Sequence, residues 1–130
     1  MKRLPDVEYE LMNAIWSLPE PVTTGQLMKA IGNEKKWKLP ALITMLNRLN
    51  EKGFIYSERG SKIRYYYTLI KKQDYLDFIA KEFMRIYFDG SFAQFFTTFY
   101  DVRMFTDDVI EQFVGWIKER RSEFKRYYSK

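Results

Sequence analysis

Apolar residues recur every three or four positions along much of this chain, which is the spacing of one face of an α-helix. The first such segment spans residues 6–18, where Asp6 is a candidate N-cap and Pro19 ends the helix. We expect the buried face of this helix to consist of Val7, Leu11, Ile15 and Leu18.

A second helix is predicted over residues 23–32. Thr23 and Gln26 have the spacing of a capping box, in which each side chain accepts a hydrogen bond from the other residue's backbone N–H. Gly32 suits a helix exit, because glycine readily adopts the left-handed conformation that ends many helices. The apolar face would consist of Leu27, Met28 and Ile31.

The polar, basic connector "NEKKWKL" leads to a third predicted helix, residues 40–52. Pro40 fits the first helical position, where the missing N–H breaks no hydrogen bond, and Gly53 ends the helix. One side of the helical wheel gathers Leu42, Met45, Leu46 and Leu49. The opposite side carries Pro40, Thr44, Asn47, Arg48 and Glu51.

Two strands are predicted in "FIYSERGSKIRYYYTL", residues 54–69, which is rich in β-branched and aromatic residues. Gly60 and Ser61 would form a two-residue turn between them. Alternation in the second strand assigns to the core side Ile63, Tyr65, Tyr67 and Leu69. Tyr66 would then point to the other face, where its hydroxyl could reach a phosphate.

Helix, short extended segment, helix, helix and hairpin follow in the order of a winged helix-turn-helix, which we assign to residues 1–70. In that layout the third helix enters the major groove of DNA and the hairpin is the wing. The predicted fold is therefore mainly α, with three helices and a small antiparallel β-sheet in the first domain. Residues 71–130 are predicted to form a helical dimerisation domain.

That helical region begins with "KKQDYLDFIAKEFMRIYF" and is interrupted at Asp89-Gly90. Its three predicted helices carry apolar stripes but have little room for a core of their own, so we expect burial against a second copy of the chain. The predicted homodimer interface includes Leu76, Ile79, Phe83, Ile86, Phe95, Phe99, Ile110, Phe113 and Ile117. The alternative is an intramolecular cap on the first domain.

The charge distribution favours a polyanionic partner. The 130-residue chain has a net charge of +5, and residues 29–64 alone hold nine basic and three acidic residues. Positive charge concentrated on the predicted winged helix favours double-stranded DNA, with a solvated surface as the alternative.

The chain has no Cys and no His, which excludes disulfides, thiol chemistry and imidazole bases. The usual zinc and copper ligands are missing as well, so we predict no metal, no cofactor and no enzymatic activity. No apolar run approaches the roughly 20 residues of a membrane helix. The N-terminus turns acidic where a signal peptide would become apolar, so we expect a cytoplasmic protein.

The candidate DNA contacts follow from this layout. Asn suits adenine, Arg suits guanine or phosphate, and small apolar groups suit thymine methyl groups. Base edges would be contacted by Ala41, Ile43, Thr44, Asn47 and Arg48. Phosphates would be held by Lys35, Lys36, Lys38, Arg59, Lys62 and Arg64. For Arg48 the alternative is a pairing with Glu51 or a nearby carbonyl.

Two segments resemble a known family. "VEYELMNAIW" (residues 7–16) is similar to the first-helix signature of the penicillinase repressor family of winged-helix repressors (the BlaI, MecI and CopY type). "LITMLNRLNEKGFIY" (residues 42–56) resembles that family's recognition helix and first wing strand. The resemblance runs from about Leu4 to Ile70 and implies bacterial repressors that bind palindromic operators as dimers held together by their C-terminal helices.

The resemblance also implies two release routes, from which this chain departs. In the antibiotic-resistance members a membrane-bound metallopeptidase sensor leads to cleavage at an Asn-Phe bond, and Thr98-Phe99 occupies that position here. In the copper-responsive members a cysteine pair senses metal, and this chain has none. Pro40-Ala41 also replaces the Lys-Thr with which many members begin the recognition helix.

We therefore predict a dimeric transcriptional repressor that binds a palindromic operator through recognition helix 40–52 and wing 54–69. The peptidase sensor is a partner by family analogy, and the release signal is not identified. The alternative is a winged-helix module for protein contact without a direct DNA role. The polar character of the exposed third-helix face favours the repressor.

Overall fold

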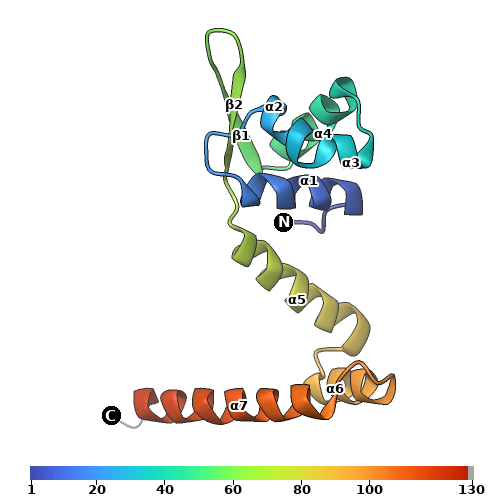
Figure 1. Ribbon diagram of the computed structural model, residues 1–130. Coiled ribbons are helices and arrows are strands. Elements are labelled where there is room, and N and C mark those ends of the chain that lie inside the picture. Colours follow the sequence, from blue (N-terminus) through green and yellow to red (C-terminus); the bar gives the residue numbers. More distant parts are fainter. Residues whose placement is uncertain (129–130) are drawn as a thin grey trace. The chain divides into compact units, whose positions relative to one another are not determined.

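The computed structural model describes residues 1–128, with side chains at residues 1–31 and 34–123 (Figure 1). The elements are, in order, α1 (Asp6–Ser17), α2 (Thr24–Leu27), the π-helical segment η1 (Met28–Gly32), α3 (Asn33–Lys35), α4 (Leu39–Glu51), β1 (Ile55–Arg59), β2 (Arg64–Thr68), α5 (Lys72–Phe88), α6 (Phe92–Asp101) and α7 (Asp107–Tyr128). The chain divides into two compact units, residues 1–82 and the part that begins at Phe83. The mainly α fold with a two-stranded antiparallel wing confirms the predicted fold class.

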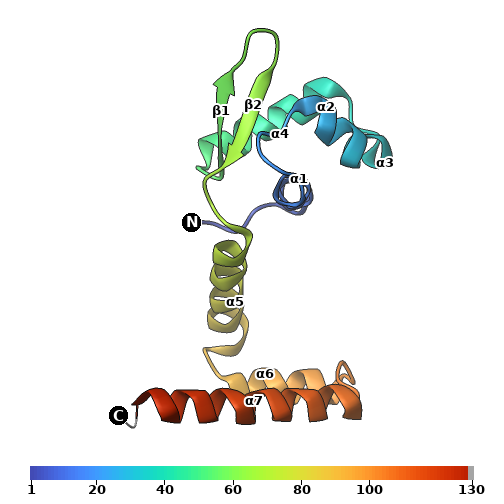
Figure 2. The same ribbon diagram turned by 60° about the vertical axis from the view of Figure 1, so that its left-hand side comes forward.

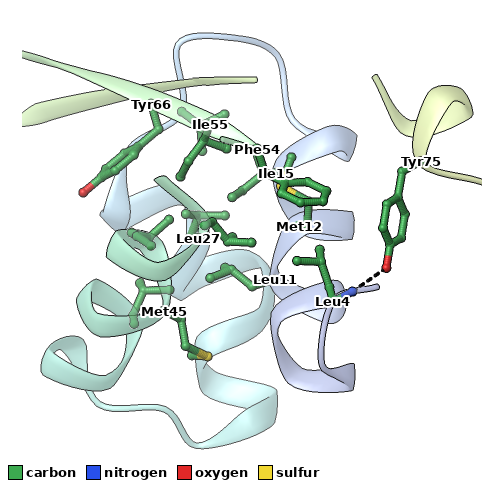
Figure 3. Close-up of a cluster of buried hydrophobic side chains, with 14 residues drawn as sticks. Leu4, Leu11, Met12, Ile15, Leu27, Met45, Phe54, Ile55, Tyr66 and Tyr75 are labelled. Carbon is green, nitrogen blue, oxygen red and sulfur yellow. Dashed lines mark hydrogen bonds between the residues drawn. The ribbon is translucent and has the colours of Figure 1, made fainter. Parts of the chain in front are cut away.

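The core of the first unit is enclosed by α1, α2, α4 and the base of the hairpin (Figure 3). The α4 side chains in it are the four predicted from the helical wheel, Leu42, Met45, Leu46 and Leu49. Other elements contribute Leu4, Leu11, Met12, Ile15, Val22, Leu27, Phe54, Ile55, Tyr66 and Tyr75. The helical wheel thus gave the right buried face of α4.

The prediction for α1 was wrong at two positions near its start. Val7 is 47% exposed, and the buried stripe runs instead through Glu8, Leu11, Met12 and Ile15. A pattern of hydrophobic residues does not predict a buried glutamate. Glu8 can be buried because its carboxylate pairs with the Lys52 ammonium. Asp6 lies in the first turn and is not the cap, because the N-cap position is Pro5.

The second helix begins as predicted but continues further. Thr23 and Gln26 form both hydrogen bonds of the capping box. Gly32 does not end the helix, because the chain passes through the π-helical segment and α3 before it turns. The turn occurs at Lys36, whose φ of 57° is the left-handed conformation expected of a residue just after a helix.

The recognition helix starts and ends close to its predicted bounds. It begins at Leu39, one residue earlier than predicted, so that Pro40 lies within the first turn, where its missing N–H breaks no helical hydrogen bond. Lys52 follows the last helical residue, and Gly53 with a φ of 81° reverses the chain.

The two faces of the hairpin are opposite to the prediction. Tyr66 is 5% exposed and faces the core, whereas Ile63 and Leu69 are 51% and 58% exposed. Tyr66 is held there by Val22: the two residues exchange backbone hydrogen bonds of 3.0 and 2.8 Å. Both faces of this strand are aromatic, so alternation alone fits either orientation, and the bridge to Val22 decides between them.

The tip of the hairpin also differs from the predicted two-residue turn. Pairing of the strands ends at Arg59 and Arg64, and the N–H of Gly60 donates to the carbonyl of Ile63 at 2.7 Å. The centre of the turn is therefore residues 61–62. A Cβ atom on Gly60 would lie 2.6 Å from the Ile63 carbonyl oxygen and 2.6 Å from a Tyr65 ring carbon, so close approach selects glycine here.

Gly60→Ala is accordingly expected to open the hairpin tip and destabilise the first unit by about 1–3 kcal/mol, because the Ile63 backbone cannot easily move away. The matched control is Gly25→Ala in α2, where the new Cβ would meet only the Thr23 hydroxyl at 3.9 Å. It should leave stability unchanged or raise it by up to about 1 kcal/mol. Urea unfolding and amide exchange of the hairpin would test this, and equal behaviour of the two variants would contradict it.

The first turns of α5 belong to the first unit. Tyr75 is 2% exposed, and its ring contacts those of Tyr9, Trp16 and Phe54. Its hydroxyl accepts the N–H of Leu4 at 2.8 Å (Figure 3). This packing moves the boundary between compact units to within α5, past residue 70. The predicted division into a DNA-binding domain of residues 1–70 and a dimerisation domain of residues 71–130 stays a prediction.

The second unit has an aromatic interior of its own. Helices α6 and α7 lie side by side in both views (Figures 1 and 2), joined by ring contacts of Phe113 with Phe92 and Phe96. The predicted interface residues Phe95, Phe99, Ile110, Phe113 and Ile117 are half-buried within this unit. Around them the exposed apolar side chains include Ile86, Phe92, Val102, Met104, Val109, Val114 and Trp116.

Candidate nucleic-acid interface

The outward side of α4 carries the predicted base-contacting residues, all of them exposed: Ala41, Ile43, Thr44, Asn47 and Arg48. They are presented outward because the four buried α4 side chains fix the rotation of the helix. Within the described part of the chain, the Arg48 guanidinium has neither a hydrogen bond nor an ion pair, so the alternative pairing with Glu51 is not formed. Arg48 is therefore available to an external acceptor.

The hydroxyl of Thr44 is already in use as a donor. It donates to the carbonyl of Pro40 at 2.9 Å, one helical turn back. A hydroxyl has one hydrogen and two acceptor lone pairs, so Thr44 still offers an acceptor and its methyl group. In this geometry Thr44 can accept a hydrogen bond from DNA or contact an apolar group with its methyl, but its hydroxyl hydrogen is already used.

The C-terminal end of α4 is anchored by an ion pair that the sequence did not reveal. The Lys52 ammonium lies 2.6 Å from a carboxylate oxygen of Glu8, which is 4% exposed. Burial of a carboxylate is unfavourable without such a partner. This contact joins the end of the recognition helix to α1. The only signal for it in the sequence is that Glu8 lies on the same helical face as Leu11 and Ile15.

The three lysines before α4 are in different situations. Lys35 forms an ion pair of 2.8 Å with Glu10 of α1, and this hydrogen bond and charge raise the pKa of the Lys35 ammonium. Lys36 and Lys38 are exposed on the turn that leads into α4. Lys35 must therefore share its charge between Glu10 and any phosphate, whereas Lys36 and Lys38 need not.

Both arginines of the wing lie on one of its faces. Arg59 and Arg64 are directly opposed in the strand register and lie on the same face as the buried Ile55 and Tyr66. Arg64 donates to the Ser57 hydroxyl at 3.0 Å. Like charges at opposed cross-strand positions destabilise a hairpin, and a bound anion would relieve that repulsion. Lys62 is exposed at the tip.

Tyr66 lies on the core-side face of the wing, opposite to the predicted face, and its contact with a phosphate stays a prediction. Its ring packs against the core, and burial raises the pKa of its hydroxyl. On the outer face of the hairpin the exposed Tyr56 stacks on the half-buried Tyr67, with 4.9 Å between the ring centroids.

The base of the wing is fastened to the loop after α1. A carboxylate oxygen of Glu20 accepts from both the hydroxyl and the backbone N–H of Thr68, at 2.6 and 2.7 Å. These hydrogen bonds to the charged form hold the pKa of the Glu20 carboxyl below its usual value. Together with the Val22 bridge they fix the hairpin on the helices, and hence Arg59 and Arg64 relative to α4.

Leu39 is a further surface residue that pattern analysis missed. It is 47% exposed at the first position of α4, beside the predicted contacts. The predicted helix start at Pro40 had placed it in the connector, and only the observed boundary reveals it. Among the described residues we find neither a cluster of potential metal ligands nor a helix long and apolar enough to span a membrane.

Comparison with known proteins identifies the family to which the chain belongs. A family model described as Penicillinase repressor matches residues 4–119. This chain belongs to the penicillinase repressor family. Methicillin resistance regulatory protein MecI of Staphylococcus aureus strain N315 is 28% identical over 109 residues, or 84% of this chain and 88% of that protein. MecI of Mammaliicoccus sciuri is 27% identical over the same shares of both chains.

Among solved structures, similarity extends to the monomeric form of Bacillus licheniformis BlaI in complex with the blaP half-operator. That chain is 27% identical, with a TM-score of 0.48 over 57% of this chain and 89% of the other. Proteins of the penicillinase repressor family are transcriptional regulators and not enzymes, so this chain is a DNA-binding transcriptional repressor with a winged helix-turn-helix. The predicted family and regulatory role are thereby confirmed.

Proposed function

We propose that this chain represses transcription as a homodimer bound to a palindromic operator, with α4 in the major groove and the β1–β2 wing along the adjacent backbone. In this proposal Asn47 and Arg48 contact bases, assisted by Ala41, Ile43 and Thr44. Phosphates are held by Lys35, Lys36, Lys38, Arg59, Lys62 and Arg64. The family assignment favours DNA binding over a winged helix used only for protein contact.

The observation that carries the proposal is the pairing of Arg59 with Arg64 on the core-side face of the wing. Two opposed guanidinium groups weaken the hairpin unless an anion lies between or beside them. The exposed side chains of Asn47 and Arg48 on α4 and the lysines before it complete a basic surface on the same unit. A phosphate backbone matches this distribution of charge, since phosphates hold a protein in register while bases are read.

The second unit supports the homodimer. Its exposed apolar side chains include Val102 and Met104, both 64% exposed, and Trp116, 52% exposed. An apolar cavity of about 120 Å³ opens between α6 and α7, lined by Phe92, Phe95, Phe96, Phe105, Val109, Ile110 and Phe113. Large exposed apolar patches are unusual on a monomer, and association removes such side chains from water. Phe83 and Ile86 of α5 belong to the same unit and are exposed as well. Of the other two predicted interface residues, Leu76 is exposed on the first unit and Ile79 packs on the core of that unit.

The proposal assigns no cleavage to the bond between Thr98 and Phe99. That bond lies inside α6, where the Thr98 hydroxyl donates to the carbonyl of Gln94 at 2.8 Å. The Phe99 ring packs on Phe95 at 4.5 Å between ring centroids. A peptidase would need this helix to open locally before it could act. The membrane-bound sensor therefore remains an analogy with other family members, and the release signal stays unidentified.

Selection of bound duplexes from a random library by the purified chain tests the proposal. We expect a symmetric motif whose half-sites are separated by about one helical turn, or a multiple of it. The affinity for it should fall steeply with salt, because phosphate contacts release counterions. Sedimentation of the free chain should give the mass of a dimer.

Two outcomes would each contradict one part of the proposal, either operator binding or the homodimer. Absence of any enriched motif at low salt would overturn operator binding. An asymmetric single half-site bound by a monomer would overturn the homodimer while leaving the contacts of α4 and the wing in place.

A further inference from the structure

The first two turns of α4 present aliphatic side chains to solvent. Leu39 is 47% exposed and Ile43 is 39% exposed, and Pro40 and Ala41 between them are exposed as well. None of these residues is needed for the core, since α4 packs through its opposite side. An aliphatic patch at the start of a recognition helix is therefore a feature of the binding surface.

This part of α4 also lacks free side-chain donors. Leu39, Pro40, Ala41 and Ile43 are apolar, and the hydroxyl hydrogen of Thr44 is directed to the carbonyl of Pro40. The side chains of residues 39–44, all described by the structure, therefore cannot donate to the N7 and O6 acceptors of guanine. They can make apolar contacts, and Thr44 can accept a hydrogen bond.

The side chains of Leu39, Ile43 and Asn47 follow one another at intervals of four residues and so form a single row along the helix. Two aliphatic groups thus lead to an amide that can pair with adenine. Basic residues flank the row, with Lys36 and Lys38 before it and Arg48 beside it. This charge fits a nucleic acid, and the methyl group that base edges present in the major groove is the C5-methyl of thymine.

We propose that Leu39 and Ile43 are specificity-determining residues that contact thymine methyl groups in each half-site, next to the base pair read by Asn47. The inference deepens the proposed function and rests on it. Guanine is disfavoured at the same positions, because its acceptors would be buried against aliphatic groups without a donor.

Single replacement of thymine by deoxyuridine in the selected operator isolates the methyl group, because deoxyuridine keeps every hydrogen-bonding group of thymine. We expect one or two positions per half-site at which the replacement weakens binding of the parent chain about fourfold, as burial of one methyl group implies. In Ile43→Ala or Leu39→Ala the same replacement should have less than a twofold effect. Fluorescence anisotropy with labelled duplexes measures both.

The matched control is Val7→Ala, which removes an exposed aliphatic side chain from α1 of the same unit and should keep the full response to deoxyuridine. Circular dichroism melting would verify that all three variants fold. An operator that binds tightly but shows no sensitive thymine, or whose sensitivity persists in both α4 variants, overturns the inference and leaves the proposed function intact. If the library yields no operator at all, it is the proposed function that fails.

Discussion

Replacing Tyr75 by alanine is expected to lower the free energy of unfolding of the first unit by about 3–5 kcal/mol, as for other buried aromatic residues. Its ring is 2% exposed and touches the rings of Tyr9, Trp16 and Phe54. Its loss would leave a cavity where α5 meets the winged helix. It would also leave the buried N–H of Leu4 without its acceptor.

Tyr75→Phe separates these two causes. It keeps the ring contacts and removes only the acceptor, so we expect a loss of about 1–3 kcal/mol. The control is Tyr87→Ala in the same helix, where the side chain is 69% exposed. It should change the stability of the first unit by less than about 0.5 kcal/mol. Amide exchange of the buried α4 residues reports on this unit, and unchanged protection in Tyr75→Ala would contradict the assignment of Tyr75 to its core.

Asn47→Ala is expected to weaken binding to the selected operator by about 10- to 100-fold for each half-site, the range of one bidentate contact with adenine. Asn47 is exposed on the outward side of α4, in the same row as Leu39 and Ile43. Because the contact reads a base, a library selection repeated with this variant should lose its preference at one base pair per half-site.

Two comparison variants distinguish a base contact of Asn47 from a backbone contact. Asn13→Ala removes the same side chain from an exposed position of α1 and should leave affinity and preference unchanged. Arg59→Ala should weaken binding to all sequences alike and lower the dependence on salt, by about 0.9 for each half-site, or about 1.8 for the dimer, in the slope of log affinity against log salt concentration. If Asn47→Ala behaves like Arg59→Ala, then Asn47 contacts the backbone and does not read bases.

The helices were predictable because each has a one-sided pattern. In α4 the residues Leu42, Met45, Leu46 and Leu49 gather on one side of the helical wheel while the polar residues lie on the opposite side, so one rotation buries the large apolar groups together. The capping box of Thr23 and Gln26 lies within a single helical turn and needs no tertiary contact. The family resemblance carried by α1, α4 and the first wing strand is likewise a property of local sequence.

The hairpin was not predictable to the same degree, because residues 65–67 are all tyrosine. An alternating pattern specifies a face only when the two faces differ in polarity. Here they do not, and the orientation depends on a backbone bridge to Val22, more than 40 residues earlier in the chain. The same holds for Glu8, a residue that pattern analysis assigns to the surface until Lys52 is brought next to it.

The sequence by itself thus determined the order of helices and strands, the buried side of α4, the concentration of positive charge and the family. Each depends on spacing or composition within a short segment. Only the tertiary structure decided which face of the wing carries Arg59 and Arg64, which carboxylate anchors the recognition helix, and that Leu39 lies exposed at its first position. Those features depend on contacts between residues distant in sequence, or on where a helix begins, and local periodicity constrains neither.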